Sequence, residues 1–267
     1  MMENTNYNIC IVSYPRSGNT FMRHIFKDVF GLFSWNSYDR YRFLSDVADS
    51  PWVRERDMFF INNRHYTPEE LKELFPSRII KTHELPDDSA PFPDQDTFII
   101  LIIRDGRDAV VSEAHHRSDI IEPGSPFSGN LLEAICAPGG SHFGGWSANL
   151  KAWIPRAHLI FHFEQLIAEP EKCIRKLMEH CPLPVPDFTR IPTFESQREG
   201  KHAYISNDRI GDFADDFSRL FFRRGEPGAW REEMPPEMQQ LFLERHGTVL
   251  EELGYHKDNI ESLKYHL

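Results

Sequence analysis

Four short segments combine cations, hydroxyls and backbone N–H groups in patterns suited to a small polyanion. The first is Y-P-R-S-G-N-T, residues 14–20, between an apolar run and a helical pattern. From Ser17 to Thr20, successive N–H groups would open a helix, where unpaired donors and the helix dipole favour an anion. Arg16 adds a full charge. The segment lacks the lysine of a Walker A loop, and a simple capped helix start is the alternative interpretation.

The second segment, R-D-G-R-D-A-V-V-S over residues 104–112, directly follows a continuous apolar run. Arg104 would stand at the carboxyl end of a central strand, where open α/β sheets bind ligands. Ser112 lies eight residues further on, about two helical turns, so both side chains could face one anion. An ion pair between Arg104 and Asp108 is the alternative. A magnesium-dependent NTPase would usually have an acidic residue where Arg104 stands.

The remaining two segments are R-R-G-E-P-G-A-W, residues 223–230, and K-T-H, residues 81–83. Adjacent arginines before a glycine can direct guanidinium and N–H groups at one phosphate, although a solvated basic pair is the commoner case. Lys81 and His83 would end a short strand beside the first segment. His83 there suits general-base chemistry, because a neutral imidazole titrates near working pH. Glu84 is the nearest carboxylate that could act instead.

The elements that must position these segments alternate between strands and helices. Apolar runs predict buried parallel strands over residues 8–14, 77–82, 96–103 and 158–163. Helical patterns cover residues 19–30, 107–116, 171–180, 213–222 and 236–253. This order predicts an α/β fold with a central parallel sheet flanked by helices. No clean linker interrupts it, so we expect residues 1–267 to form a single domain.

The composition excludes several classes of protein. The chain has 267 residues, with 30 Lys and Arg against 41 Asp and Glu, and a formal net charge of −11. That balance disfavours a nucleic-acid or anionic-membrane binder. Its four cysteines form no C-x-x-C pair, which argues against a disulfide scaffold or zinc site, although Cys173 and Cys181 could bridge if geometry allowed. Without a leader or an apolar run near 18 residues, the cytoplasm is the expected compartment.

Together the four segments resemble the cytosolic-type sulfotransferases, which use 3′-phosphoadenosine-5′-phosphosulfate (PAPS). Y-P-R-S-G-N-T-F resembles that family's 5′-phosphosulfate loop, Y-P-K-S-G-T-x-W, and K-T-H matches the strand with its lysine and catalytic histidine. R-D-G-R-D-A-V-V-S resembles the 3′-phosphate segment R-N-x-x-D-x-x-x-S, and R-R-G-E-P-G-A-W resembles R-K-G-x-x-G-x-W. F-H-F-E-Q-L-I-A-E-P is similar to Y-E-D-L-x-x-x-P. The motifs follow the family's order over roughly residues 8–231.

The resemblance implies a P-loop-kinase-like sulfotransferase fold and transfer of a sulfuryl group from PAPS to a hydroxyl or amine, leaving adenosine 3′,5′-bisphosphate (PAP). It implies that His83 is the general base, and that Lys81 and Arg16 neutralise the leaving phosphate. It assigns to the donor Arg16, Ser17, Gly18, Asn19, Thr20, Phe21, Arg104, Ser112, Phe163, Phe194, Arg223, Arg224 and Gly225. No metal is required by these residues.

Within that set, the resemblance divides the donor into three parts. Arg16 to Thr20 would hold the 5′-phosphosulfate. The 3′-phosphate would be held by Arg104, Ser112, Arg223, Arg224 and Gly225, and the adenine would be flanked by Phe21, Phe163 and Phe194.

Arg16, Phe21 and Phe163 differ from the residues that are usual at these positions of the family. Arg16 replaces a lysine and can bridge two oxygens rather than act as a point charge. Phe21 replaces a tryptophan and Phe163 a tyrosine, which keeps the stacking surface but removes a hydroxyl. The family's dimer motif is not visible after Trp230, so no oligomeric state follows.

The sequence specifies the acceptor-binding site less closely than the donor-binding site, because aromatic and cationic residues are mixed in the segments concerned. The aromatic ones before K-T-H are Trp35, Tyr38, Tyr41, Phe43, Trp52, Phe59, Phe60 and Tyr66. Phe127, Phe143 and Trp146 lie in a Gly/Pro-rich stretch further on. Such residues suit a phenol, sterol or polyketide, and ordinary core packing is the alternative. The interleaved arginines, which would also suit an anionic sugar, are Arg40, Arg42, Arg54, Arg56 and Arg64.

Two other functions compete with sulfuryl transfer to a small molecule. One is a P-loop nucleotide kinase or NTPase, disfavoured by the missing Walker lysine and by Arg104. The other is a non-catalytic nucleotide-binding protein of the same fold, disfavoured by His83 beside Lys81. An amine acceptor would need no base, and with a sugar acceptor Glu84 could replace His83.

Overall fold

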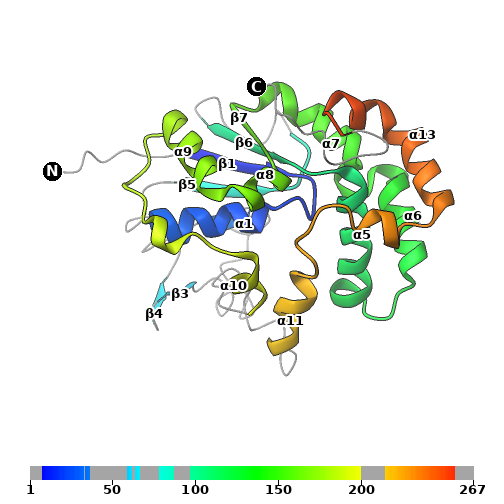
Figure 1. Ribbon diagram of the computed structural model, residues 1–267, viewed down its shortest axis with the longest axis horizontal. Helices are drawn as coiled ribbons and strands as arrows, with labels where there is room; N and C mark the ends of the chain where they lie inside the picture. Colours follow the sequence, from blue (N-terminus) through cyan, green and yellow to red (C-terminus); the bar gives the residue numbers. More distant parts are fainter. Residues whose placement is uncertain are drawn as a thin grey trace, which may run out of the picture.

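A five-stranded parallel sheet forms the centre of the protein (Figure 1). The computed structural model describes residues 8–32, 34–36, 59–61, 64–66, 78–86, 97–199 and 214–255. In spatial order the strands are β2 (Trp35–Asn36), β5 (Arg78–Thr82), β1 (Asn8–Ser13), β6 (Phe98–Ile103) and β7 (Leu159–His162). A separate antiparallel pair joins β3 (Phe59–Ile61) to β4 (Arg64–Tyr66). The predicted α/β class with a central parallel sheet is confirmed.

The register makes the three central strands end level. Val12 of β1 pairs with Thr82 of β5 on one side and with Leu101 of β6 on the other. Because all three strands run parallel, the turns that follow them leave from the same edge of the sheet. The predicted anion and K-T-H segments therefore meet at this edge.

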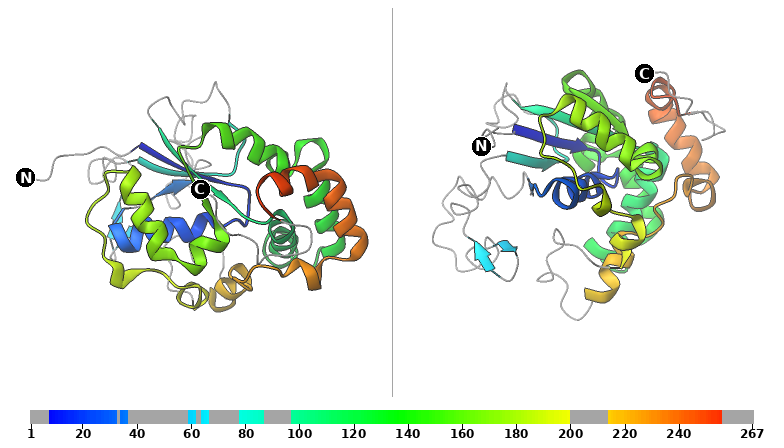
Figure 2. Two further views of the ribbon diagram at one scale, coloured as in Figure 1. Left: turned by 45° about the horizontal axis from the view of Figure 1, so that its top comes forward. Right: turned by 60° about the vertical axis from the view of Figure 1, so that its left-hand side comes forward.

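Helices cover both faces of the sheet (Figure 2). They are α1 (Asn19–His24), α5 (Gly106–His116), α6 (Phe127–Cys136), α7 (Trp146–Trp153), α8 (Phe163–Ala168), α9 (Pro170–His180), α10 (Phe194–Arg198), α11 (Ala214–Phe221), α12 (Trp230–Glu233) and α13 (Pro236–Glu252). Two continue as π-helical turns, Ile25–Val29 after α1 and Arg117–Ile121 after α5. Short 3-10 turns occupy Pro138–Gly140, His142–Gly144, Ile154–Arg156 and Phe188–Arg190.

Alternating strand residues divide the apolar interior into two cores. On one face, Cys10 and Val12 of β1 pack with buried residues of α5, α6, α7 and α13. On the opposite face, Ile9 and Ile11 pack with residues of α1, α8 and α9. Each strand is therefore apolar on both sides, which explains the continuous apolar runs in the sequence.

The Gly/Pro-rich stretch after α5 is more regular than its sequence indicates. It folds into α6 and α7, joined by a turn in which residues 142–145 all have positive φ angles. The helices have ten and eight residues, so each offers too few turns for a clear helical period.

Two further structural facts concern the cysteines and the helices. All four cysteines are free thiols, so the bridge considered between Cys173 and Cys181 does not form. In the part of the chain that the structure describes, no helix combines the length and hydropathy needed to cross a membrane.

The start of α5 should tolerate no side chain, because Gly106 packs directly against aromatic rings. A Cβ atom there would lie 2.5 Å from two Trp146 ring atoms and 2.7 Å from Phe242 Cζ. Gly106→Ala is expected to lower the free energy of unfolding by roughly 1–3 kcal/mol, as overpacking does, measured by urea denaturation. Gly129→Ala in α6 is the control. Its Cβ would meet Pro126 at an ordinary 3.5 Å, so stability should hold or rise, and equal losses in both variants would refute the packing argument.

Candidate functional site

The turn between β1 and α1 is shaped by two residues with left-handed backbone conformation. Gly18 has φ +97°, and a Cβ there would lie 2.6 Å from the Phe163 ring, so only glycine fits. Arg16 has φ 61°, which is uncommon for a residue with a side chain. Asn19 fixes the helix start by donating to Ile11 O and Ser13 Oγ, both at 3.2 Å. The predicted turn, with Ser17 buried and Thr20 half-buried, is therefore tightly held.

The Arg16 side chain connects this turn to two other elements. Its Nε donates to Ser112 Oγ of α5 at 3.2 Å, and its guanidinium also donates to the Phe221 carbonyl of α11. The guanidinium carbon lies 4.2 Å from the centre of the Phe221 ring, within cation–π range. Burial lowers the pKa of Arg16 to about 10, with Glu113 opposing this effect, so the group remains cationic at neutral pH.

Arg104 follows β6 and lies against the same turn. One guanidinium nitrogen donates to Arg16 O at 2.8 Å, and the group stacks over Phe163 at 4.5 Å. Its Nε is buried and has no hydrogen-bond partner among the described residues. The ion pair that forms in this segment joins Arg107 to Asp105, 2.7 Å apart and buried. The Arg104–Asp108 ion pair considered from the sequence is absent from the described contacts.

Asp108 instead holds the C-terminal loop that carries the paired arginines. Its carboxylate accepts from Gly228 N at 2.6 Å and from Trp230 N at 3.1 Å. Burial raises the pKa of Asp108, and nearby Arg104 opposes that shift. Within the loop, Gly225 has φ +68°, and a Cβ there would lie 2.3 Å from the Phe194 ring. The predicted loop residues are thus brought beside α5.

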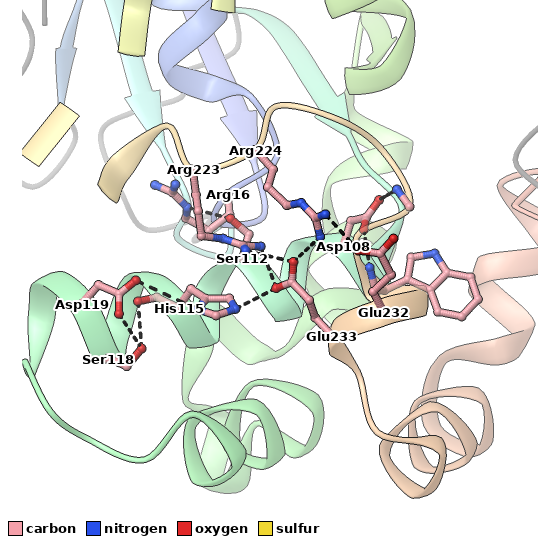
Figure 3. A network of polar contacts seen from close by, with 12 residues as sticks. Arg16, Asp108, Ser112, His115, Ser118, Asp119, Arg223, Arg224, Glu232 and Glu233 are labelled. Atoms are coloured by element: carbon pink, nitrogen blue, oxygen red, sulfur yellow. Dashed lines mark hydrogen bonds and ion pairs between the residues drawn. The ribbon is translucent and has the colours of Figure 1, made fainter. Parts of the chain in front are cut away.

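Arg223 and Arg224 both bind Glu233 of α12 (Figure 3). A guanidinium nitrogen of Arg223 donates to Glu233 Oε1 at 2.9 Å, and one of Arg224 donates to it at 2.5 Å. Arg224 also pairs with Glu232 at 2.9 Å, and His115 Nε2 lies 2.7 Å from Glu233 Oε2. An anion that binds these arginines must therefore compete with carboxylates. Neither Glu232 nor Glu233 was predicted from the sequence. The one feature that could have indicated them is their position shortly after the loop of residues 223–230.

His83 sits at the end of β5 with its ring anchored to β1. Its Nδ1 lies 2.7 Å from the carbonyl oxygen of Ser13. Since a carbonyl can only accept, Nδ1 is the protonated nitrogen, and in the neutral ring Nε2 keeps its lone pair. Burial lowers the pKa of His83 well below its usual value, and the positive charge of Lys81 lowers it further. The ring is therefore neutral at physiological pH.

Two more titratable residues of α5 interact with Arg16 and Lys81 and were not predicted. Burial raises the pKa of Glu113, which faces Arg16, Arg117 and Lys81. Burial also lowers the pKa of His116 to about 3, and its Nδ1 lies 3.9 Å from Glu113 Oε2. They make this side of the site more polar than the aromatic residues alone indicate.

The predicted aromatic residues have different surroundings. Phe21 and Phe163 are only 4% and 7% exposed and pack in the core beside α1. Trp146 is fully buried against Phe242, as the core alternative expected. Phe143 lies beside His83, with ring centres 5.7 Å apart.

Many of the other candidate acceptor residues belong to parts of the chain that the structure does not describe, or describes by their backbone alone. Those outside the described residues are Tyr38, Arg40, Tyr41, Arg42, Phe43, Trp52, Arg54 and Arg56. Five more lie in the strands β2, β3 and β4, of which the structure describes only the backbone: Trp35, Phe59, Phe60, Arg64 and Tyr66.

The chain is similar to known proteins in sequence and in fold. The sulfotransferase domain model matches residues 7–254. Sulfotransferase 1B1 of Mus musculus is 28% identical over 244 residues, covering 86% of this chain and 78% of its own. Sulfotransferase 1E1 of Rattus norvegicus is 24% identical over 248 residues, covering 89% and 81%.

Two solved structures share the fold. A crystal structure of mouse sulfotransferase SULT7A1 complexed with PAP is similar with a TM-score of 0.62 at 18% identity, covering 94% of this chain and 90% of that one. Retinol dehydratase in a complex with retinol and PAP is similar with a TM-score of 0.64 at 19% identity, covering 99% and 85%.

Removing one acceptor atom from Asp108 should loosen the loop that carries the arginines. In Asp108→Asn the amide nitrogen cannot accept, so one of the bonds to Gly228 N and Trp230 N is lost. Hydrogen bonds to charged groups contribute about 1.5–3 kcal/mol, so we expect these two amides to exchange roughly 10- to 100-fold faster in hydrogen-exchange NMR. Asp119→Asn, on the far part of the network in Figure 3, is the control. Unchanged exchange at both amides would show that Asp108 does not hold the loop.

Proposed function

The chain belongs to the sulfotransferase domain family, and on that premise we propose that it transfers a sulfuryl group from PAPS to a small-molecule acceptor with His83 as general base. Family membership identifies it as a PAPS-dependent sulfotransferase. The observation that carries the specific proposal is the contact between His83 Nδ1 and Ser13 O. That contact leaves Nε2 of a neutral ring as the proton acceptor.

The described residues fit a bisphosphorylated nucleotide. The turn after β1 and the loop after α11 both close around glycines whose Cβ positions are filled by aromatic rings, at Gly18 and Gly225. Three arginines of the set, Arg16, Arg104 and Arg223, lie close enough to affect one another. Arg104 also has a buried Nε without a described partner. Such a cationic group suits a donor that carries phosphate at both ends.

The proposed roles of the individual donor-binding residues follow the resemblance to the family's motifs. Arg16, Ser17, Gly18, Asn19 and Thr20 would hold the 5′ end, near Lys81. Residues from three elements would hold the 3′-phosphate, namely Arg104, Ser112, Arg223, Arg224 and Gly225. Phe21, Phe163 and Phe194 would flank the adenine. Lys81 and Arg16 would stabilise charge on the leaving phosphate, since fixed cations act strongly where charge develops.

We further propose that the acceptor is a small molecule with a hydroxyl or an amine. The Phe143 ring beside His83 favours a flat or apolar acceptor such as a phenol, sterol or polyketide over a sugar. A single domain over residues 1–267 and a location in the cytoplasm belong to the same proposal. A screen of phenols, sterols, amines and sugars with PAPS, read by mass spectrometry, tests it. Sulfate adducts support the proposal, and PAPS turnover without any adduct contradicts it.

Replacing the base should slow the reaction without weakening donor binding. His83→Ala is expected to lower turnover by about 10²–10⁴-fold, the usual share of general-base catalysis, and to leave PAP affinity nearly unchanged.

In the wild type, protonation of His83 removes the base, so activity falls as the pH drops through the pKa of His83. Because that pKa is lowered, the fall should lie below pH 6.5. Wild-type turnover in His83→Ala would instead favour Glu84 or an amine acceptor.

Arginines at the 3′ end should distinguish PAP from adenosine 5′-monophosphate. A charge-assisted hydrogen bond contributes about 1.5–3 kcal/mol, so Arg104→Ala should weaken PAP roughly 10- to 150-fold in calorimetry and the monophosphate far less. Arg224→Ala should act in the same direction. Equal weakening of both nucleotides would show that these residues do not read the 3′-phosphate.

Glu233→Gln provides the opposite arm of that experiment. The carboxylate pairs with Arg223 and Arg224, and replacing it by a neutral amide weakens both ion pairs while Arg224 keeps its contact with Glu232. We therefore expect PAP to bind more tightly to Glu233→Gln than to the wild type. The affinity for adenosine 5′-monophosphate, which lacks the 3′-phosphate, should change little. Weaker PAP binding would mean that Glu233 orients the arginines rather than competing for them.

A further inference from the structure

A buried asparagine lies directly behind the strand end that carries His83. Asn149 of α7 is fully buried, and its Nδ2 donates to His83 O at 2.9 Å and to Phe143 O at 3.2 Å. One amide group thus holds two backbone carbonyls that belong to different parts of the site. None of the motifs in the sequence includes this residue.

The second carbonyl belongs to a strained turn. His142 and Phe143 have φ angles of 51° and 56°, and Gly144 and Gly145 follow with 82° and 85°. A left-handed conformation is strained for a residue with a side chain, so the turn persists because surrounding contacts hold it. The turn positions the Phe143 ring, whose centre lies 5.7 Å from that of the His83 ring and whose plane is inclined to it by 60°.

The backbone after β5 is held by α7 at two consecutive residues. Asn149 binds the His83 carbonyl, and Trp153, one turn further along the helix, donates from Nε1 to Glu84 O at 2.9 Å. On its other side the His83 ring is held through Nδ1 by Ser13 O. The imidazole is therefore fixed between β1 and α7, with its backbone and its ring restrained by different elements.

The asparagine is not explained by packing alone. Its Oδ1 is buried and has no hydrogen-bond partner among the described residues. A buried polar atom without a partner costs free energy, whereas an apolar side chain of similar size would avoid that cost. The two N–H donors are what an apolar replacement would lose.

Resting on the proposed function, we propose that Asn149 is a positioning residue for the His83 base. It acts through the backbone, keeping Nε2 directed at the acceptor and Phe143 against the ring. In the step concerned, the acceptor O–H bond breaks, its proton goes to Nε2, and the electron pair stays on the acceptor oxygen as that oxygen attacks sulfur. The bond between sulfur and the phosphate oxygen of PAPS breaks at the same time, and its electron pair leaves on the phosphate of PAP. Asn149 itself touches neither substrate.

The kinetic test compares two buried asparagines. Asn149→Ala removes both donors, and a displaced base should lower kcat by about 10- to 100-fold, with PAP affinity and the KM for PAPS changed by less than about twofold. Asn149→Gln keeps both N–H donors on a longer side chain and should recover part of the loss. Asn130→Ala is the matched control. Asn130 of α6 is also buried, but its Nδ2 donates to Ser125 Oγ, just before that helix, at 2.8 Å. Its replacement should therefore leave kcat unchanged.

A spectroscopic readout needs no acceptor. In ¹⁵N NMR of the PAP-bound protein, with signals assigned through His83→Gln, wild-type His83 should be the Nδ1–H tautomer. Asn149→Ala should show a mixture of tautomers, and Asn130→Ala should not. Asn149→Ser keeps one hydrogen-bond donor and is measured in the same way. If Asn149→Ala does not fold, the tautomer of His83 in Asn149→Ser decides whether the residue positions the base.

The outcomes separate this inference from the function on which it rests. If wild-type His83 lacks the Nδ1–H tautomer, or His83→Ala keeps full turnover, the base assignment itself fails. If the wild type behaves as expected but Asn149→Ala retains its tautomer, the positioning role is overturned and the base assignment stands. A lower kcat with an unchanged tautomer also overturns it, because a merely structural role would give that result.

Discussion

The level ending of β1, β5 and β6 is the constraint on which the site depends. Because Val12 pairs with Thr82 on one side and Leu101 on the other, the next residues of all three strands reach the same edge. Ser13 then meets the His83 ring through its carbonyl, and Arg104 meets the turn after β1 through Arg16 O. A shift of one residue in either pairing would reverse which face each side chain occupies and would separate the base from the anion-binding turn.

Charge is concentrated at that edge in a chain that is acidic overall, with a net charge of −11. Glu113 compensates Arg16 and Lys81, and Glu233 compensates Arg223. Burial lowers the pKa of His83, and the positive charges of Lys81 and Arg16 lower it further. Under the proposed function, Lys81 and Arg16 would therefore help both to bind the donor and to keep the base neutral. In the same proposal, Glu233 would have to release Arg223 and Arg224 when a phosphate binds.

The sequence predicted the parts of the molecule that local chemistry determines. Apolar runs located four of the five strands of the main sheet, and the turn residues located Arg16, Gly18, Arg104 and the paired arginines. It missed α6 and α7, because helices this short show no clear period among glycines and prolines. Asn149, Glu113 and Glu233 were not predicted either, since each of them contacts residues that only the folded chain brings near, such as His83, 66 positions before Asn149. Those relations exist only once the sheet has brought the segments together.

Sulfuryl transfer through a neutral His83 is the central claim, and product stoichiometry tests it most directly. The measurement follows PAP and sulfated acceptor together by mass spectrometry, in the wild type and in His83→Gln, at saturating PAPS and a pH near 7. The account predicts one sulfated acceptor for each PAP in the wild type, and a much slower rate in His83→Gln although that variant still binds PAP. PAP formed without a sulfated acceptor, or equal rates in the two proteins, would contradict it.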